Sequence, residues 1–427
     1  MATIFIDPTS RPGGSGALFR PYKSWSQVTF SPGNTYVQRA GTSTAATINI
    51  AAEGTATAPI RIGSYGSGAA PVIDGIINLN GAAYVTVSGM TIRNAGGAAI
   101  AIQAGAHHNS VHGNTLAQSM IGVWIGNGAG GDNAIVQNTV RDNAIIGIGV
   151  HEISNPDGHP TTIAGNTVTA SGAHGIDITG NNFIVVANTV SRSGLTISGA
   201  SGIHVFGGAE AAPNGYGIAN IIVSNVTFDN RDATGPDGNG IQLDQYTYGN
   251  TVIGNLATGN DGAGVMLYDS HGNTVAGNFA DANQLDPGGT HPLRGDFVLA
   301  GSLDLTQANF IAGNTALSTA GPAVLVDALT ADNANGFSGN VWQNAGGGAS
   351  TMRGLDSSWS GWLAYDMTAG SGLPADAETG VAVLRAPYAG ALSYSFDNGA
   401  TRMIDGISYA LIGWTGSQLV VGGEAVV

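Results

Sequence analysis

The chain has no cysteine, a single lysine (Lys23) and no long apolar run. Without cysteine it forms no disulfide and no thiolate metal site. The formal net charge is −15, so no basic surface is available to neutralise phosphates or anionic lipids. No stretch approaches the roughly 20 apolar residues of a membrane-spanning helix. We therefore expect no nucleic-acid partner and no membrane partner.

Charged residues are also scarce, at 10% of the chain, whereas glycine accounts for 68 of the 427 residues. The polarity comes mostly from Asn, Ser and Thr, which are poor helix formers. Apolar residues make up 43% of the chain, which is enough for a buried core. The composition predicts a folded, all-β protein.

A repeat organises the chain from residue 114 to residue 340. An Asn closes motifs such as NTVIGN and NTVAGN, and its shortest spacings are 22 to 24 residues. This Asn recurs at Asn114, Asn138, Asn166, Asn188, Asn225, Asn255, Asn278, Asn314 and Asn340. A fixed period of this length indicates stacked coils, with inserted loops where the spacing is longer. Asn side chains at the corners can bind the turn backbone and the Asn of the next coil.

A second register starts at a glycine in each coil and continues with alternating aliphatic residues. The glycines are Gly122, Gly147, Gly175, Gly202, Gly240 and Gly264. The aliphatic pairs that follow are Val123 and Ile125, Ile148 and Val150, Ile176 and Ile178, Ile203 and Val205, Ile241 and Leu243, and Val265 and Leu267. A period of two predicts strands with one buried face, and short strands at a fixed period predict a parallel β-helix.

The pattern resembles the right-handed parallel β-helix superfamily of pectate-lyase-like proteins. Residues 32–75, from PGNTYVQRAG to PVIDG, look like the first coils of its polysaccharide-lyase-type members. The resemblance implies a right-handed, single-stranded parallel β-helix over residues 1–345. Beyond it we expect a C-terminal β-rich cap or extension over residues 346–427, because the Asn repeat stops there.

The outward positions of the predicted strands carry unusual residues. Two positions after the glycine, the outward column reads Trp124, Gly149, Asp177, His204, Gln242 and Met266; four positions after, it includes His151, Thr179, Phe206, Asp244 and Tyr268. Aromatic faces beside polar groups suit a carbohydrate. Gly149 and Thr179 should leave a hollow between them. The insertions at 154–160, 207–217, 229–238 and 283–295 are expected to wall a cleft.

These columns supply the candidate site residues. Neighbouring coils lie about 4.8 Å apart, so Asp177 is expected close enough to His204 to orient its imidazole. The catalytic candidates are Asp177, His204, Asp244, Tyr268, His151 and Glu152. The substrate-binding candidates are Trp124, Phe206, Gln242, Gln245, Asp269 and Arg294, and no residue is assigned to a metal.

The segment GIGVHE, residues 147–152, is similar to the strand of alginate C5-epimerases that carries a catalytic Asp and His before Glu. His151 and Glu152 match the family's His-Glu. Gly149 stands where the family has Asp, and Thr179 replaces the Asp of the next coil. The similarity therefore indicates where a site lies more than which reaction it performs.

Three function classes fit these residues. The first is a polysaccharide lyase or epimerase, which takes a proton at C5 and needs a cation, Ca²⁺ or an arginine such as Arg231 or Arg294, to neutralise the sugar carboxylate. The second is a glycoside hydrolase or intramolecular glycosyl transferase that uses paired carboxylates, Asp177 and Asp244, on a neutral glycan. The third is a non-catalytic glycan-binding or structural β-helix, as in an adhesin or tailspike.

All three classes share a polysaccharide or oligosaccharide partner and a monomeric or homotrimeric β-helix. No cofactor is certain, and Ca²⁺ applies only to a lyase. The opening residues MATIFIDPTS lack the basic start and apolar core of a secretory signal. Because the expected substrate is a polysaccharide, we nevertheless predict an extracellular or secreted protein.

Overall fold

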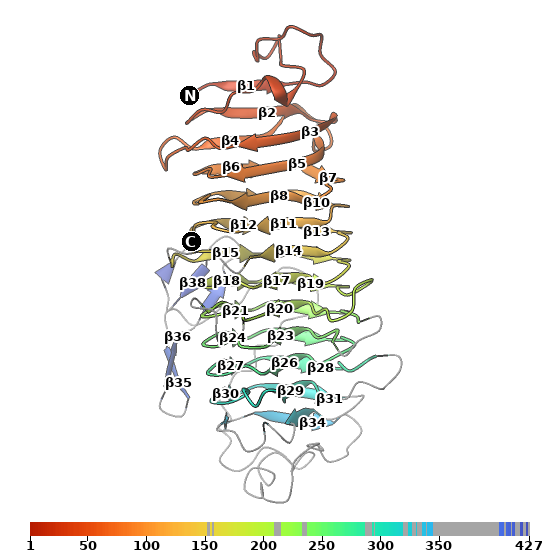
Figure 1. Ribbon diagram of the computed structural model, residues 1–427, viewed down its shortest axis with the longest axis vertical. Helices are drawn as coiled ribbons and strands as arrows, with labels where there is room; N and C mark the ends of the chain where they lie inside the picture. The colour runs from red at the N-terminus through yellow and green to blue at the C-terminus, as the bar shows by residue number, and fades with distance from the viewer. Residues whose placement is uncertain are drawn as a thin grey trace, which may run out of the picture. The chain divides into compact units, whose positions relative to one another are not determined.

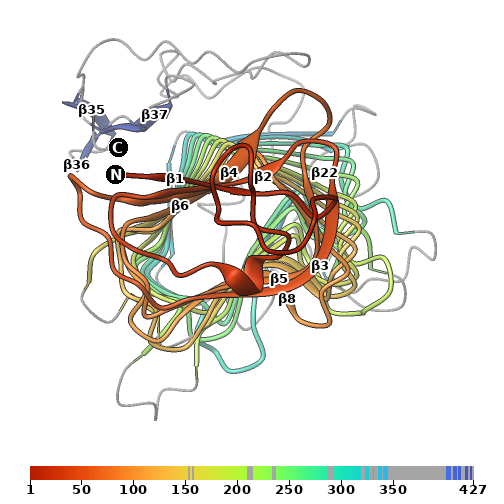
Figure 2. The same ribbon diagram turned by 90° about the horizontal axis from the view of Figure 1, so that it is seen from above.

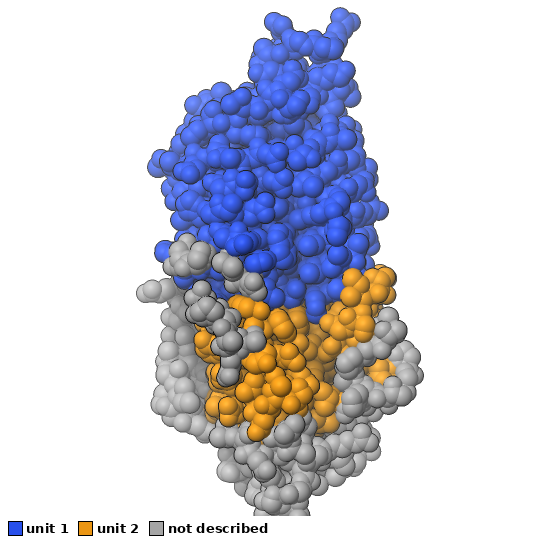
Figure 3. All heavy atoms as spheres, in the orientation of Figure 1, with its two compact units in different colours: residues 1–184 blue, residues 185–427 orange. Residues whose placement is uncertain are grey.

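The computed structural model describes residues 1–151, 154–155, 158–208, 215–232, 237–286, 293, 295–318, 323–326, 330, 335–338 and 340–344, and five short strands between 401 and 425. The chain divides into two compact units, residues 1–184 and residues 185–427 (Figure 3). Each unit is built from short strands that recur once per coil and pair in parallel with the same strand of the next coil (Figure 1).

Three ladders of parallel strands form the unit 1–184. The first ladder contains β1 (Thr3–Ile6), β2 (Thr35–Arg39), β4 (Ile60–Tyr65), β6 (Val85–Ser88), β9 (Ser110–His112), β12 (Ala134–Val136) and β15 (Thr161–Ala164). The second contains β3 (Ser43–Ile50), β5 (Val72–Asn80), β7 (Thr91–Arg93), β10 (Thr115–Ala117), β13 (Thr139–Arg141) and β16 (Thr167–Thr169). The third continues from the end of β5 through β8 (Ala98–Gln103), β11 (Ile121–Ile125), β14 (Ile146–Val150) and β17 (Ile176–Ile178). A 3₁₀ turn, η1 (Trp25–Gln27), lies near the start.

The unit 185–427 repeats the same three ladders. The first contains β21 (Ile221–Val223), β24 (Thr251–Ile253), β27 (Thr274–Ala276), β30 (Phe310–Ala312) and β33 (Gly336–Ser338). The second contains β19 (Thr189–Ser191), β22 (Val226–Phe228), β25 (Leu256–Thr258), β28 (Phe279–Asp281), β31 (Thr315–Ser318) and β34 (Val341–Asn344). The third contains β20 (Ile203–Val205), β23 (Ile241–Leu243), β26 (Val265–Tyr268), β29 (Phe297–Ala300) and β32 (Val324–Val326). The strand β18 (Phe183–Val186) spans the boundary between the units.

The aliphatic pairs identified in the sequence are the core of these coils. Their side chains are 0–1% exposed; examples are Ile148 and Val150 on β14 and Ile241 and Leu243 on β23. Burying such a side chain stabilises the fold by about 1.5–3 kcal/mol, and each coil repeats the contribution. The coils of residues 1–184, red to yellow in Figure 2, overlie one another when viewed from above. The prediction of a parallel β-helix is confirmed.

The recurring Asn residues stabilise the corners of the coils as the sequence predicts. Asn138 donates from Nδ2 to the carbonyl of Val111 (2.8 Å) and to Oδ1 of Asn166 (3.0 Å). Asn255 does the same with Ile222 and Asn278, both at 2.9 Å. Two further columns, missed in the sequence, flank this one in the second unit: Asn250, Asn273 and Asn309, and Asn230, Asn260 and Asn283.

The glycine that opens the third strand of a coil is required by the closeness of the next coil. A Cβ on Gly202 would lie 2.6 Å from Nδ2 of Asn230, and one on Gly264 would lie 2.8 Å from Nδ2 of Asn283. Asp296 takes the glycine's place before β29, and its Oδ1 accepts a bond from Asn283 Nδ2 at 2.7 Å. Burial raises the pKa of Asp296 to about 6.

The predicted cap over residues 346–427 falls mostly outside the described residues. Within it the structure gives only backbone strands: β35 (Thr401–Ile404) pairs antiparallel with β36 (Ile407–Ala410), and β37 (Ile412–Trp414) pairs with β38 (Leu419–Val421), which pairs with β39 (Glu424–Ala425). The domain boundary near residue 345 stays a prediction. No helix in the described part of the chain is long and apolar enough to cross a membrane.

Candidate functional site

The outward columns predicted from the sequence exist in each unit with the expected register. On the first unit Trp124 pairs with Gly149, and Gly149 pairs with Asp177. On the second unit His204 pairs with Gln242, and Gln242 pairs with Met266. Because paired residues of a parallel ladder point to the same side, each set lies on one face of its unit.

The hollow expected at Gly149 is filled, so that prediction is wrong. A Cβ on Gly149 would lie 2.9 Å from two ring carbons of Trp124, so the indole occupies the space beside this glycine. The imidazole of His151 stands edge-on to the same indole, with ring centroids 6.0 Å apart. Thr179 donates its hydroxyl to the carbonyl of Val150 at 2.5 Å. Glycine at 149 therefore makes room for the tryptophan rather than for a ligand.

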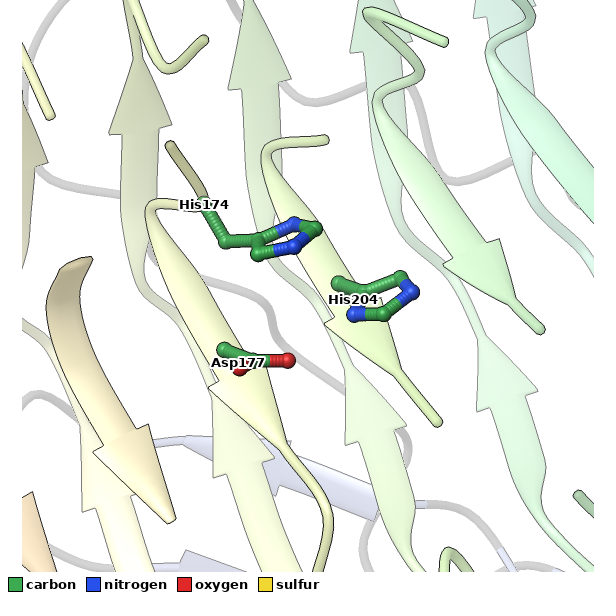
Figure 4. A group of neighbouring side chains, drawn as sticks. All are labelled: His174, Asp177 and His204. Carbon is green, nitrogen blue, oxygen red and sulfur yellow. The ribbon is translucent and has the colours of Figure 1, made fainter. Parts of the chain in front are cut away.

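Figure 4 shows His174 and Asp177, from the coil of β17, together with His204 on β20. Within the unit 1–184, one ligand atom of His174 lies within 4.8 Å of one of Asp177. The sequence analysis missed His174, although it directly precedes the repeated glycine Gly175.

His204 and Asp244 form a contact that the sequence analysis placed only approximately. His204 Nε2 lies 3.3 Å from Asp244 Oδ2, and the two side chains are 10% and 21% exposed. Phe206 stacks beside His204, with centroids 6.1 Å apart and planes inclined by 22°. The imidazole is thus held between an aromatic ring and a carboxylate, and the carboxylate remains accessible at the surface.

Gln242, next to His204 in the column, belongs to a hydrogen-bonded network. Its Oε1 accepts bonds from the Ser201 hydroxyl (2.6 Å) and from Asn239 Nδ2 (3.1 Å). Asn239 in turn accepts the backbone N–H of Ala263 at 2.7 Å. These contacts fix the side chain of Gln242, which is only 4% exposed.

Asp237 is a member of the site that the sequence analysis did not single out. It lies at the end of the insertion 229–238, and its Oδ1 accepts a bond from Asn239 Nδ2 at 3.1 Å. The pKa of Asp237 is raised to about 6, mainly by burial. The carboxyl groups of Asp244 and Asp232 also raise this pKa, whereas His204 and a hydrogen bond with Gln242 lower it. Its sequence context, Pro-Asp-Gly, is typical of a turn, so the sequence gives no reason to select Asp237 as a site residue.

Arg231, a candidate for neutralising a sugar carboxylate, is engaged elsewhere. Its guanidinium binds Asp261 at 2.5 Å and also contacts Asp229. Both partners belong to the same unit and come from the loops after β22 and β25. Arg231 therefore stabilises these loops and offers little free charge to a ligand.

Three other candidates have well-defined places. Tyr268 is partly buried and packs against an apolar cluster that includes Met266 and Val298. Gln245 donates its backbone N–H to Asp244 Oδ1 at 2.8 Å. Asp269 is fully buried and accepts the backbone N–H groups of Ser302 and Leu303, both at 2.9 Å. The carboxylate of Asp269 thus holds a turn and does not reach the surface.

Two candidates, Glu152 and Arg294, lie outside the described residues, as do parts of the four insertions expected to wall the site. Their predicted roles stay predictions.

A family model described as the right-handed β-helix region matches residues 74–214 and 153–357, which together span more than half of the chain. The chain belongs to the right-handed β-helix family. Membership confirms the handedness that the sequence resemblance implied.

Several solved β-helix structures are similar at low identity. The GH136 lacto-N-biosidase of Eubacterium ramulus is 13% identical with a TM-score of 0.52, covering 79% of this chain and 68% of the other. A mannuronic-acid-specific polysaccharide lyase of family 6 from human gut microbiota is 15% identical with a TM-score of 0.50, covering 81% and 87%. The A-module of an Azotobacter vinelandii mannuronan C-5 epimerase is 15% identical with a TM-score of 0.46, covering 73% and 85%. The first two likenesses show the β-helix fold alone. No curated protein sequence matches the chain.

Proposed function

We propose that this β-helix protein is a carbohydrate-active enzyme that cleaves a polysaccharide, by hydrolysis or glycosyl transfer, on the outward face of β20 and β23. The observation that carries the proposal is Asp244, a partly exposed carboxylate held 3.3 Å from the imidazole of His204. The names of two fold relatives, a lacto-N-biosidase and a mannuronic-acid-specific lyase, support a glycan substrate.

Asp244 supplies a partly exposed carboxyl group, which glycoside cleavage requires. Such a carboxylate either activates a water molecule or attacks the anomeric carbon itself. The imidazole Nε2 of His204 lies 3.3 Å from this carboxyl group, and Gln245 donates its backbone N–H to it at 2.8 Å. The side chain of Phe206, half-buried beside His204, offers an apolar face against which the C–H groups of a sugar ring can pack.

The charge of the chain favours a neutral glycan. The formal net charge is −15, and the site gathers the carboxyl groups of Asp232, Asp237 and Asp244. Arg231 is already paired with Asp261 and Asp229. A polyuronate would meet like-charge repulsion here unless a cation intervened.

Because a polysaccharide is too large to enter a cell intact, we place the enzyme outside the cell.

A lyase or C5-epimerase is the second candidate, and the His204–Asp244 pair itself favours it. A carboxylate beside an imidazole makes the imidazole a better base. In elimination, His204 would accept the C5 proton and the C–H electron pair would form the C4–C5 double bond. The C4–O bond would break with its electron pair on the departing oxygen, which would take a proton from water and leave as a hydroxyl group. This reaction needs a cation for the sugar carboxylate, for which Ca²⁺ is a candidate.

Incubation of the purified protein with neutral and acidic polysaccharides, with and without EDTA, tests both candidates. Hydrolysis or transfer gives new reducing ends or altered products without ultraviolet absorbance; elimination gives unsaturated uronate, which absorbs. Either activity should be lost in Asp244→Ala and His204→Ala and kept in Asp281→Asn, a variant on β28 outside the site. If no polysaccharide gives new reducing ends, altered products or ultraviolet absorbance, an enzymatic role is refuted and a glycan-binding protein is favoured.

A further inference from the structure

Trp124 has only small residues at three neighbouring positions on the outward face of the unit 1–184. It lies on β11, and its neighbours in the same column are Ala101 on β8 and Gly149 on β14. Gly126, two positions further along the chain, lies on the same face. Ala101 is only 7% exposed although it belongs to this face. The ring of Trp124 is therefore the one large group in this part of the column.

The indole of Trp124 occupies the space of two absent side chains. A Cβ on Gly126 would lie 2.9 Å from Nε1 and 3.1 Å from Cδ1 of the indole, and a Cβ on Gly149 would lie 2.9 Å from Cε3 and from Cζ3. These two pairs of atoms belong to opposite ends of the ring system. Because both ends lie at the height of a Cβ, the long axis of the indole runs along the sheet from one glycine to the other. The side chain is partly exposed, so part of the ring faces solvent.

Amide side chains lie in the coils before this ring. Asn78 on β5 is two coils before Trp124 in the same column, and it donates from Nδ2 to Asn49 Oδ1 at 2.8 Å. Gln103, the last residue of β8, lies in the other outward column, and a Cβ on Gly126 would lie 3.2 Å from its Cβ. The amide of Gln103 is partly exposed and binds no other group in the part of the chain that the structure describes. Such an amide offers a ligand both donors and an acceptor.

An imidazole and a carboxyl group lie in the coils after the ring. The imidazole of His151, which follows β14, is nearly perpendicular to the indole (86°), with ring centroids 6.0 Å apart. Asp177 on β17 is two coils after Trp124 in the same column. Strands β8, β11, β14 and β17 contain no lysine and no arginine, and Trp124 is their only aromatic residue. This face therefore sets one aromatic ring among hydrogen-bonding groups.

The chemistry of this face suits a neutral sugar. The apolar C–H face of a pyranose packs on an aromatic ring, and the hydroxyl groups around it need donors and acceptors at the sides. A polyuronate would meet Asp177 and find no lysine or arginine on these strands. A protein partner would bury about 800 Å² on each side and use several large anchors, whereas this face has one aromatic ring.

We propose that the outward face of β8, β11 and β14 is a binding site for a neutral oligosaccharide. The indole of Trp124 is the platform for one sugar ring, and the amide of Gln103 binds hydroxyl groups beside it. The site binds the glycan without forming or breaking a bond. It shares no residue with the His204–Asp244 pair, so the inference does not rest on the proposed cleavage.

Titration with cellohexaose, mannohexaose and xylohexaose, followed by calorimetry and by tryptophan fluorescence, tests this site. The whole chain carries Asp244→Asn, so that the proposed cleavage does not consume the probes. At least one hexaose should bind and change the tryptophan emission, because the sugar contacts an indole. Adding Trp124→Ala should weaken binding at least about tenfold. Adding Trp124→Phe should keep the affinity within about threefold, since a ring remains, and should abolish the emission change.

Tyr84→Ala is the matched control. Tyr84 is a partly buried aromatic residue of the same unit that directly precedes β6, outside this ladder, and packs on His108 with ring centroids 4.6 Å apart. This variant should leave both the affinity and the emission change unaltered. Gln103→Ala, which leaves the indole in place, should weaken binding about threefold to tenfold. A melting curve of each variant shows whether it is folded at the temperature of the titration.

Several results would overturn the inference. They are the absence of binding by all three neutral hexaoses, an unchanged affinity in Trp124→Ala, and an emission change that persists in Trp124→Phe. Equal weakening by Trp124→Ala and Tyr84→Ala would show a general structural effect and would also overturn it. A mannuronate hexamer that binds as tightly as the best neutral probe would overturn the assignment to neutral glycans. A protein that binds a hexaose at Trp124 and cleaves no polysaccharide would refute the proposed function and leave this inference intact.

Discussion

The corners of the coils and the outward face of β20 and β23 both consist of polar side chains, but the two regions use them differently. At the corners, Asn225, Asn255 and Asn278 are 0–2% exposed and bind one another and the backbone from coil to coil. On the outward face, His204, Gln242 and Met266 differ from coil to coil, and Asp237, whose pKa is raised, precedes β23 in the chain.

This contrast indicates that repetition marks structure and variation marks chemistry. A buried amide that repeats finds a matched partner in the next coil, so its hydrogen bonds are satisfied by the fold itself. A side chain that does not repeat has no such partner and must be satisfied by a local network or by a ligand. Four substitutions test this division between the two regions.

The largest expected effect is on activity and belongs to the outward face. Asp244→Asn should lower kcat/KM about 10³-fold, because the amide cannot act as base or nucleophile. Thermal unfolding should be nearly unchanged, since Asp244 is partly exposed. Kinetics on the polysaccharide identified by the panel, beside a melting curve, would check both. A large loss of stability in this variant would contradict the division.

The next effect is on stability and belongs to the corners. Asn255→Ala should lower the free energy of unfolding by about 3–4 kcal/mol, because it leaves the Ile222 carbonyl and the donors of Asn225 unpaired in the interior. Denaturant unfolding measures it, with Thr258→Ala on the half-buried face of β25 as the control. Activity per folded molecule should not change; a selective loss of kcat would show that the corners also serve catalysis.

Asp296 tests a corner that carries a charge. Burial raises the pKa of Asp296 to about 6 in the native state, whereas the unfolded chain releases this proton near pH 4. The native state therefore loses free energy of unfolding as the pH rises from about 4 through 6. Asp296→Asn should raise the free energy of unfolding at pH 8 by about 2 kcal/mol and have little effect at pH 4. Urea unfolding at the two pH values measures the difference. Equal effects at both would rule out titration as the cause.

The smallest effect concerns Gly149, an outward position used for packing. Gly149→Ala should cost about 1 kcal/mol of stability, because its Cβ would lie 2.9 Å from the ring of Trp124. In a Trp124→Ala background the same change should cost almost nothing. A double-mutant cycle by urea unfolding gives the coupling. Additive effects would mean that the indole does not rest on this glycine.

The sequence by itself determined the fold, because each of its periodic features has one physical role in a stacked coil. The alternating aliphatic residues are buried, the glycines allow the next coil to approach, and the repeated Asn residues bind at the corners. It also determined the register of the outward columns, since Gly149 with Asp177 and His204 with Gln242 pair as the spacing required. Periodic features are visible in sequence because every coil must solve the same packing problem.

Only the tertiary structure decided which outward residues work together. Trp124 covers Gly149, Asp269 turns inward to hold a turn, and Arg231 is paired with Asp261; none of these choices repeats, so no period reveals them. Asp237 stands in an ordinary turn sequence, and only the structure shows that its carboxyl lies beside Asn239 and Gln242 and is desolvated there. Its pKa depends on desolvation and on neighbouring charges, which are set by contacts between residues distant in sequence rather than by the residues themselves.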